Sequence, residues 1–160
     1  MSALNIRRAT LEDAELLAQL NGAVQQIHYE ARPDFYKPPV VTDELIADFR
    51  SRLADDQNYI FIAEIESTPI GYTLTQIVER SDSPYSYATR SLLIDQISVN
   101  ADQRSHGYGE ALMQHAFDLA KSLGITRVLV GVWAFNERAI AFYERQGFKP
   151  RDVRMEVNLS

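Results

Sequence analysis

The sequence predicts one α/β domain over residues 1–160, and three observations support this. Runs with strand character alternate with runs of helical periodicity, and no repeat or long linker divides the chain. Two β-rich runs, 58–65 and 69–78, are separated by a short turn, which is typical of an antiparallel hairpin. Strand, glycine loop, helix and strand then follow one another over residues 90–133, which indicates a right-handed crossover between parallel strands. We therefore expect a sheet with both strand orientations.

Length and composition limit the class of protein. A chain of 160 residues with 46% hydrophobic content suffices for one core. No run approaches the ~18 apolar residues that span a bilayer, and charges interrupt the N-terminus before any apolar stretch, so we expect a soluble cytoplasmic protein without a membrane partner. The absence of cysteine excludes disulfides, a thiolate nucleophile and cysteine-ligated zinc. The net charge of −6 argues against nucleic acid as the main partner and is compatible with a cationic substrate.

The N-terminal part begins with a short strand over residues 5–9. Thr10 and Asp13 then form the pattern of a capping box, which predicts the start of a helix. Apolar positions from Leu17 to Ile27 follow helical spacing, and the pattern fades near His28. One amphipathic helix is therefore expected here.

A loop and a second helix follow. Residues 31–41 contain three prolines and two aromatic residues, which is typical of a loop. Thr42 is placed to cap the next helix, which has acidic residues in its first turn. Its apolar positions are Leu45, Ile46, Phe49 and Leu53.

The C-terminal part alternates strands and helices. After the hairpin, residues 90–99 predict a third β-rich strand, and residues 109–124 predict a helix that stops at Gly124. Residues 126–133 have the pattern of a buried strand. A helix over 136–147 is capped by Asn136 and stopped by Gly147. Residues 153–159 alternate apolar and polar side chains, which predicts a last strand.

The segment QRSHGYGEAL, residues 103–112, points to an anion site. Gly107 and Gly109 allow backbone conformations closed to other residues and a close approach of N–H groups to a ligand. The helix that follows adds partial positive charge at its N-terminus. Phosphate is the anion that this arrangement suits best.

Three other interpretations of the glycine loop fit the residues less well. A Walker loop is excluded because no Gly-Lys-Ser/Thr follows. A dinucleotide-binding loop fits poorly because the third glycine and an acidic residue on the next strand are missing. A purely structural turn into the helix would suffice if the loop stood alone.

Two motifs together resemble the GNAT superfamily of N-acetyltransferases. Residues 97–124 are similar to its Arg/Gln-x-x-Gly-x-Gly/Ala segment, with Arg104, Gly107 and Gly109 on the marked positions. Residues 128–150 are similar to its strand-Asn-helix-Tyr-Gly-Phe segment. The resemblance implies a mostly antiparallel twisted sheet with a parallel central strand pair, flanked by about four helices. It also implies acetyl-CoA as cosubstrate, no metal, and possible homodimers.

The resemblance also implies which residues bind the cosubstrate. The loop would wrap the pyrophosphate, the backbone of residues 97–99 would pair with the pantetheine arm, and Asn136 and Tyr143 would lie near the acetyl group. Ser105 stands where the family often has glycine, and His106 is expected to be a loop residue or phosphate neighbour. The predicted cofactor residues are Ile97, Ser98, Val99, Arg104, Ser105, His106, Gly107, Tyr108, Gly109, Glu110, Asn136 and Tyr143.

Transfer of acetyl to an amine needs an acid and a base. Tyr143 is the expected acid by resemblance, because a phenol stays protonated at neutral pH until charge develops on the departing sulfur. Asp95 is the first candidate for the base, and Glu30 and Glu64 follow. Because cysteine is absent and no Ser-His pair is evident, we expect direct transfer in a ternary complex.

The acceptor is predicted only as a primary amine of a small molecule or peptide. An aromatic and acidic rim would suit a cation. The candidate rim residues are Tyr29, Glu30, Phe35, Tyr36 and Tyr85. The alternative function is a non-catalytic acyl-CoA sensor that uses the same pocket.

Overall fold

The computed structural model describes residues 2–160 and contains one five-stranded sheet in the order β1-β2-β3-β4-β5. The strands are β1 (Leu4–Arg8), β2 (Asn58–Ile65), β3 (Thr68–Arg80), β4 (Thr89–Val99) and β5 (Val128–Val130). Neighbouring strands are antiparallel from β1 to β4, and β4 pairs with β5 in parallel. The predicted mixed sheet is confirmed, with its parallel pair at one edge.

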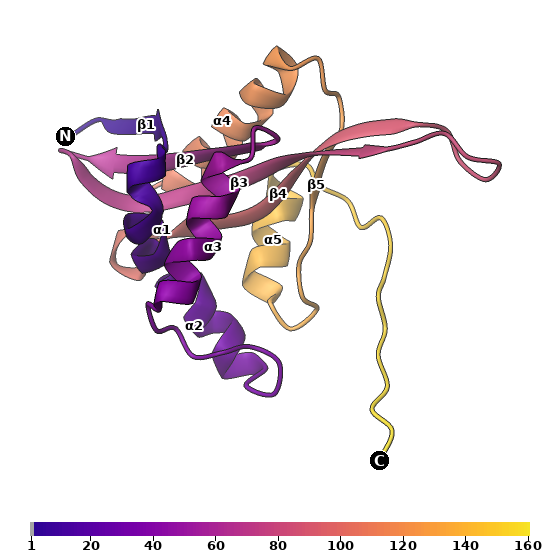
Figure 1. The fold of residues 1–160 in the computed structure, drawn as a ribbon, viewed down its shortest axis with the longest axis horizontal. Coiled ribbons are helices and arrows are strands. Elements are labelled where there is room, and N and C mark those ends of the chain that lie inside the picture. Colours follow the sequence, from indigo (N-terminus) through magenta and orange to yellow (C-terminus); the bar gives the residue numbers. More distant parts are fainter. Residues whose placement is uncertain (1) are drawn as a thin grey trace.

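Helices cover both faces of this sheet (Figure 1). The helices are α1 (Ala14–Leu20), α2 (Gly22–Ala31), α3 (Asp43–Ala54), α4 (Tyr108–Ser122) and α5 (Glu137–Arg145), with single 3₁₀ turns η1 (Leu11–Asp13) and η2 (Ala101–Gln103). Leu17 of α1 and Phe49 of α3 are buried with Leu74 of β3 in one cluster. Met113 and Ala116 of α4 are buried with Ile94 of β4 in another, against which α5 packs. The loop between α2 and α3 and the glycine loop before α4 therefore belong to different layers.

The single N-terminal helix expected from the sequence is two helices. The capping box forms as predicted, since the Thr10 N–H donates to Asp13 Oδ2 at 2.8 Å. The helix is then interrupted at Asn21, which is buried and whose amide donates to the Tyr72 hydroxyl at 3.1 Å. This contact ties the break to the sheet, and Gly22 after it weakens the helical preference. Thr42 caps α3, because its hydroxyl accepts from the Leu45 N–H at 3.1 Å.

The prediction of a last strand over residues 153–159 is wrong in this structure. Residues 149–160 form no helix or strand and run away from the sheet to the C-terminus (Figure 1). A strand needs a neighbour for its backbone groups, and the sheet ends at β5 instead. The predicted strand 126–133 is also shorter, because β5 pairs with β4 only over Val128–Val130. The resemblance implied a central parallel pair; because no strand follows β5 in the described sheet, the pair lies at its edge.

Candidate active site

The candidate site lies where the parallel strands β4 and β5 separate, and we call this separation, beyond Ile94 of β4 and Val130 of β5, the fork. β4 pairs with β3 along its length, through Val99, but with β5 only at Leu92, Leu93 and Ile94. The two parallel strands therefore separate beyond Ile94. One edge of residues 95–99 is left without a neighbouring strand in the described sheet. A sheet edge of this kind accepts an extended ligand by backbone hydrogen bonds.

A bulge at Asp95 sets which groups face the fork. Leu74 lies opposite Gln96 and Thr75 lies opposite Ile94, so Asp95 is the extra residue. At the end of the strand, the Asn100 N–H donates across to Ile70 O at 2.8 Å. Since backbone groups alternate in direction along a strand, those of Ile97 and Val99 point away from β3, toward the fork. The Arg104 guanidinium reaches the same edge and donates to Val99 O at 3.4 Å.

The glycine loop connects this edge of β4 to the start of α4. Gly107 is the N-cap of α4 with φ 80° and ψ 8°, a left-handed conformation that favours glycine. The first intrahelical bond runs from Ala111 N to Gly107 O at 3.1 Å, so the N–H groups of residues 108–110 precede it. No side chain of the described residues caps this terminus. These three N–H groups and the helix dipole can hold a phosphate.

The loop differs in one respect from the sequence prediction. Gly109 lies within the helix, and the second left-handed residue of the loop is Ser105, with φ 69°. This explains why glycine would be favoured at position 105. The His106 ring stacks on the Tyr108 ring with centroids 5.6 Å apart, and its Nδ1 lies 2.9 Å from Arg104 O. His106 is thus held by the loop itself, whereas Glu110 is exposed on the first turn of α4.

Tyr143 lies on α5, and Asn136 is the N-cap of this helix. The Asn136 side chain accepts from the Ala139 N–H at 3.2 Å and so caps the helix. Tyr143 lies two turns later, half-buried against Ile94 and Met113, with its ring 5.8 Å from that of Phe148. Burial raises the pKa of the Tyr143 phenol above its ordinary value near 10. The phenol is therefore protonated at neutral pH.

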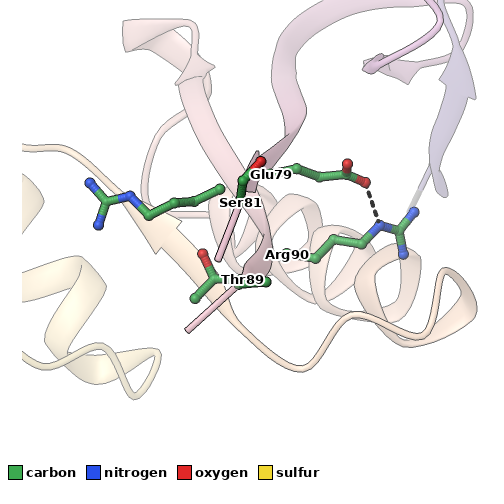
Figure 2. Close-up of a pocket in the computed structure, with 6 residues that line it drawn as sticks. Glu79, Ser81, Thr89 and Arg90 are labelled. Carbon is green, nitrogen blue, oxygen red and sulfur yellow. Dashed lines mark hydrogen bonds and ion pairs between the residues drawn. The ribbon is translucent and has the colours of Figure 1, made fainter. Parts of the chain in front are cut away.

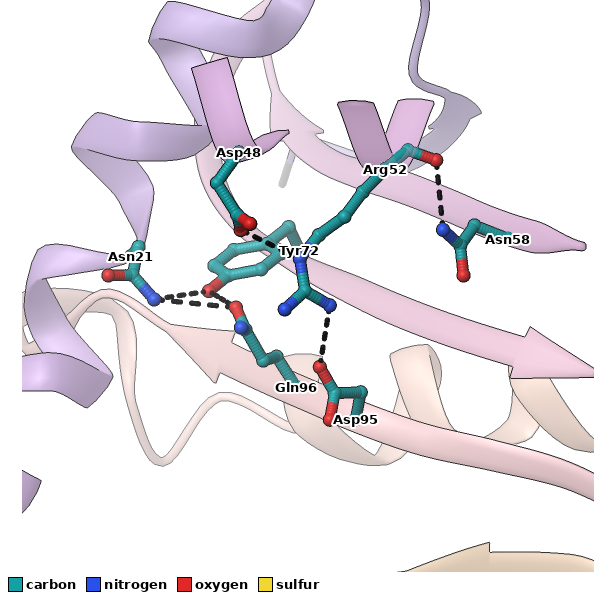
Figure 3. Close-up of polar contacts among 7 residues, drawn as sticks. All are labelled: Asn21, Asp48, Arg52, Asn58, Tyr72, Asp95 and Gln96. Atoms are coloured by element: carbon teal, nitrogen blue, oxygen red, sulfur yellow. Dashed lines mark hydrogen bonds and ion pairs between the residues drawn. The ribbon is translucent and has the colours of Figure 1, made fainter. Parts of the chain in front are cut away.

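The Asp95 side chain points toward Arg52 of α3 (Figure 3). Its Oδ2 accepts from Arg52 Nη1 at 3.0 Å, and Arg52 also contacts Asp48 at 2.8 Å. Next to it, the Gln96 amide oxygen accepts from Asn21 at 3.3 Å and from the Tyr72 hydroxyl. Burial is the largest cause of a strongly raised pKa at Tyr72, which keeps that phenol neutral. A polar network thus holds β4 at the bulge.

The two other candidate bases lie elsewhere. Glu64 lies on β2, next to the β1 edge of the sheet, whereas β5 forms the other edge. Its carboxylate accepts from Arg7 Nε at 2.7 Å. Glu30 is exposed near the end of α2, where it contacts Gln26. Neither lies in the Asp95 network.

Aromatic side chains from α2, from the loop that follows it and from the segment after β5 meet in one cluster. Tyr36 accepts from Trp133 Nε1 at 2.6 Å, and the rings of Phe35 and Trp133 lie 5.5 Å apart. The His28 ring lies 4.8 Å from that of Tyr36, and burial lowers its pKa. We call Phe35, Tyr36, Trp133, Phe135 and His28 the aromatic cluster. Sequence reasoning missed Trp133 and Phe135, which no spacing relates to residues a hundred positions earlier.

Tyr29 and Tyr85, also predicted for the rim, lie outside this cluster. Tyr29 is half-buried on α2. Tyr85 is 97% exposed in the turn between β3 and β4, which extends far from the body of the molecule (Figure 1). The prediction that Tyr85 shares a rim with Phe35 and Tyr36 is therefore wrong. Its position reflects the length of the hairpin, because the paired strands continue to Arg80 and Thr89.

A hollow of about 380 Å³ lies on the same hairpin (Figure 2). Its lining comes from both strands, and Arg90 Nε donates across them to Glu79 at 3.2 Å. The Arg90 guanidinium also donates to Leu123 O at 2.9 Å. None of the predicted site residues lines this hollow, so it is separate from the fork.

Comparisons with known proteins match the geometry. The model of the acetyltransferase (GNAT) family matches residues 23–148, more than half of the chain. The chain belongs to this family of acyltransferases.

Relatives agree with this assignment. An uncharacterised N-acetyltransferase of Methanocaldococcus jannaschii, MJ1207, is 30% identical over 66% of this chain, which spans 45% of that protein's length. The peptidyl-lysine N-acetyltransferase YjaB of Salmonella typhimurium is 26% identical over 91% of this chain and 83% of its own. Among solved structures, the aminoglycoside N-acetyltransferase AAC(6')-Iy in complex with CoA has a TM-score of 0.75 at 17% identity, covering 99% of this chain and 96% of its own. At that identity the structural match supports the fold alone.

Residues 2–160 contain neither a metal-binding cluster nor a membrane-spanning helix. No group of three or more His, Cys, Asp or Glu side chains is arranged to hold a metal ion in that range. None of the helices described there has the length and apolarity to cross a membrane.

Proposed function

We propose that this protein transfers the acetyl group of acetyl-CoA to a primary amine of a small molecule or peptide, by direct transfer in a ternary complex. The observation that carries the proposal is the fork. Residues 95–99 of β4 have one backbone edge without a neighbouring strand, and this edge leads to the N-terminus of α4, which no side chain caps. The half-buried Tyr143 packs against Ile94, where this edge begins.

The residues of the fork fit the parts of acetyl-CoA in order. The N–H groups of residues 108–110, Arg104 and the dipole of α4 suit the pyrophosphate. The outward backbone groups of Ile97 and Val99 suit the amides of the pantetheine arm, which bind as an added strand. A Cβ added at Gly107 would meet no atom within 4 Å, so space for the ligand adjoins the loop.

Two groups handle protons in the proposed reaction. The neutral amine nitrogen attacks the thioester carbonyl, so a C–N bond forms and the C–S bond breaks, and Tyr143 donates its phenolic proton to the sulfur that leaves. The tyrosinate regains a proton from the nitrogen, which loses its second proton as the amide forms. The raised pKa of Tyr143 supports this role, since the proton is present at neutral pH. Asp95 is the proposed acceptor of the proton that the ammonium loses, and Arg52 orients its carboxylate.

The aromatic cluster supports an amine acceptor. Aromatic faces attract cations, and the Arg32 guanidinium already lies 5.1 Å from the Trp133 ring centroid. The peptidyl-lysine and aminoglycoside N-acetyltransferases named above both act on amines according to their names.

Thiol release from acetyl-CoA in the presence of candidate amines tests the proposal. Amine-dependent release is expected, and Tyr143→Phe should lower it by ~10²-fold or more because the proton donor is lost. Tyr87→Phe is the matched control, because Tyr87 is 88% exposed on the β3–β4 hairpin, and its turnover should not change. Equal turnover in both variants would refute the role of Tyr143. Binding of acetyl-CoA without release for any amine would instead favour the sensor.

A further inference from the structure

Helix α2 contacts both sides of the fork. Its N-cap, Asn21, donates to the Gln96 side chain at 3.3 Å, in the part of β4 that borders the fork (Figure 3). Two turns later, the His28 ring lies 6.1 Å from that of Phe135, in the segment that leads from β5 to α5. Residues seven positions apart share one face of a helix, so Asn21 and His28 lie on the same face, about 10 Å apart along the axis. His28 is therefore on the face of α2 that is turned toward the fork.

A hydrogen bond within α2 fixes the tautomer of His28. Nδ1 lies 3.0 Å from Val24 O, and because a carbonyl oxygen only accepts, Nδ1 carries the proton. Burial is the largest cause of a lowered His28 pKa and outweighs the opposite effect of this hydrogen bond, so the ring is neutral at pH 7. Nε2 then has a lone pair, and no group of residues 2–160 donates to it. His28 thus presents a free hydrogen-bond acceptor.

The rings around His28 suit a cation. The centroids of the Tyr36 and Phe135 rings lie 4.8 and 6.1 Å from that of His28, and Trp133 lies 5.8 Å from Phe135. The faces of such rings carry negative charge density. The Tyr36 hydroxyl already accepts from Trp133 Nε1. Nε2 of His28 is therefore placed to accept an N–H from an ammonium group that the rings attract.

The titratable groups that face His28 are Arg32 on its own helix and Tyr36 from the loop that follows. Arg32, one turn after His28, donates to Asp34 at 2.8 Å and to Glu156 at 2.6 Å. Two carboxylates thus neutralise its positive charge. An ammonium group that approaches His28 consequently meets no unpaired charge from Arg32.

We propose that His28 binds the acceptor of the transfer reaction, with Nε2 accepting an N–H of its ammonium group between α2 and the fork. The inference rests on the proposed acetyl transfer and names a binding residue for its acceptor. The proton that the ammonium loses still goes to Asp95, as proposed above. Protonation of the imidazole would turn Nε2 into a donor and add a positive charge, so amine binding should weaken as the pH falls through the His28 pKa.

The KM for the amine, measured with saturating acetyl-CoA, tests the inference. A lysine-containing peptide and an aminoglycoside serve as amines. His28→Phe keeps a ring but removes the acceptor, so we expect this KM to rise by about 10-fold or more, with a much smaller change in kcat. His28→Gln places an amide oxygen near the position of Nε2 and should restore KM to within about 3-fold of the wild-type value. Equal KM in wild type and His28→Phe, or a loss in kcat as large as the rise in KM, would overturn the inference.

The pH profile separates His28 from other titrating groups. Between about pH 7 and 5.5 the KM of the wild type should rise, and that of His28→Gln should not. His115→Phe is the matched control, because His115 is half-buried on α4 against Phe61 of β2, and burial also lowers its pKa. This variant should keep the wild-type profile. A KM that rises equally in the wild type and in His28→Gln would contradict the role of His28.

Fluorescence keeps this test separate from that of acetyl transfer. Trp133 is the only tryptophan of the chain and lies in the aromatic cluster, so amine binding should change its emission even where no acetyl group is transferred. If the wild type releases no thiol with any amine, the proposed function fails, and a fluorescence titration with the same two amines decides the inference by itself. Binding by the wild type that is weakened in His28→Phe supports the inference, and no binding by the wild type overturns it.

Discussion

Two residues of the glycine loop have left-handed backbone conformations, and substitutions at these two positions should change the free energy of unfolding in opposite directions. Ser105 has φ 69° and Gly107 has φ 80°, and both lie in the region that disfavours a Cβ. That penalty is about 1–2 kcal/mol for a residue other than glycine. Ser105→Gly removes the penalty but adds about 0.4–1 kcal/mol of chain entropy to the unfolded state, so we expect a stabilisation of about 0.5–1 kcal/mol. Gly107→Ala reverses both terms and should destabilise by a similar amount.

Urea unfolding of the two variants measures these changes directly. No atom lies within 4 Å of a Cβ at Gly107, so packing adds nothing to its cost. The double variant should return close to the wild-type midpoint, because the two effects act through backbone conformation and have opposite signs. A stabilising Gly107→Ala, or a destabilising Ser105→Gly, would refute the loop conformation on which the proposed phosphate site depends.

Two further predictions concern the scaffold. Gly71→Ala should destabilise by about 2–4 kcal/mol in urea unfolding, because the new Cβ would lie 2.4 Å from Ser98 O on the neighbouring strand. Gly22→Ala is the control, since that site is open, and it should change stability by no more than about 1 kcal/mol. Hydrogen bonds from Arg7 are the largest cause of a lowered Asp13 pKa, so the stabilisation they bring is present above the unfolded pKa near 3.9 and is lost as the pH falls through the folded value. Acid unfolding of Asp13→Asn should accordingly show a shallower pH dependence than the wild type, and an unchanged profile would contradict the ion pair.

Local signals in the sequence were sufficient for most of the fold. Thr10, Thr42 and Asn136 each start a helical segment as their side chains predict, and Gly124 and Gly147 adopt positive φ after helices. These outcomes depend on contacts within a few residues, which a sequence pattern records. The order of strands and helices through α5 followed from the same patterns, apart from the break at Asn21.

Features that depend on distant contacts were not predictable. The bulge at Asp95 depends on the register between β3 and β4, and the break at Asn21 depends on its contacts with Tyr72 and Gln96. The pairing of Trp133 with Tyr36 joins loops that lie far apart in the chain. The segment 153–159 has the pattern of a strand, but a pattern cannot supply the neighbouring strand that pairing requires.

Calorimetric titration with acetyl-CoA tests the central claim, that the loop before α4 holds a pyrophosphate. We expect saturable binding by the wild type and its loss in Gly107→Glu, which puts a negative charge at the helix start. Gly107→Ala separates backbone strain from charge, and it should still bind. Absence of wild-type binding by the folded protein, or undiminished binding by Gly107→Glu, would contradict the claim.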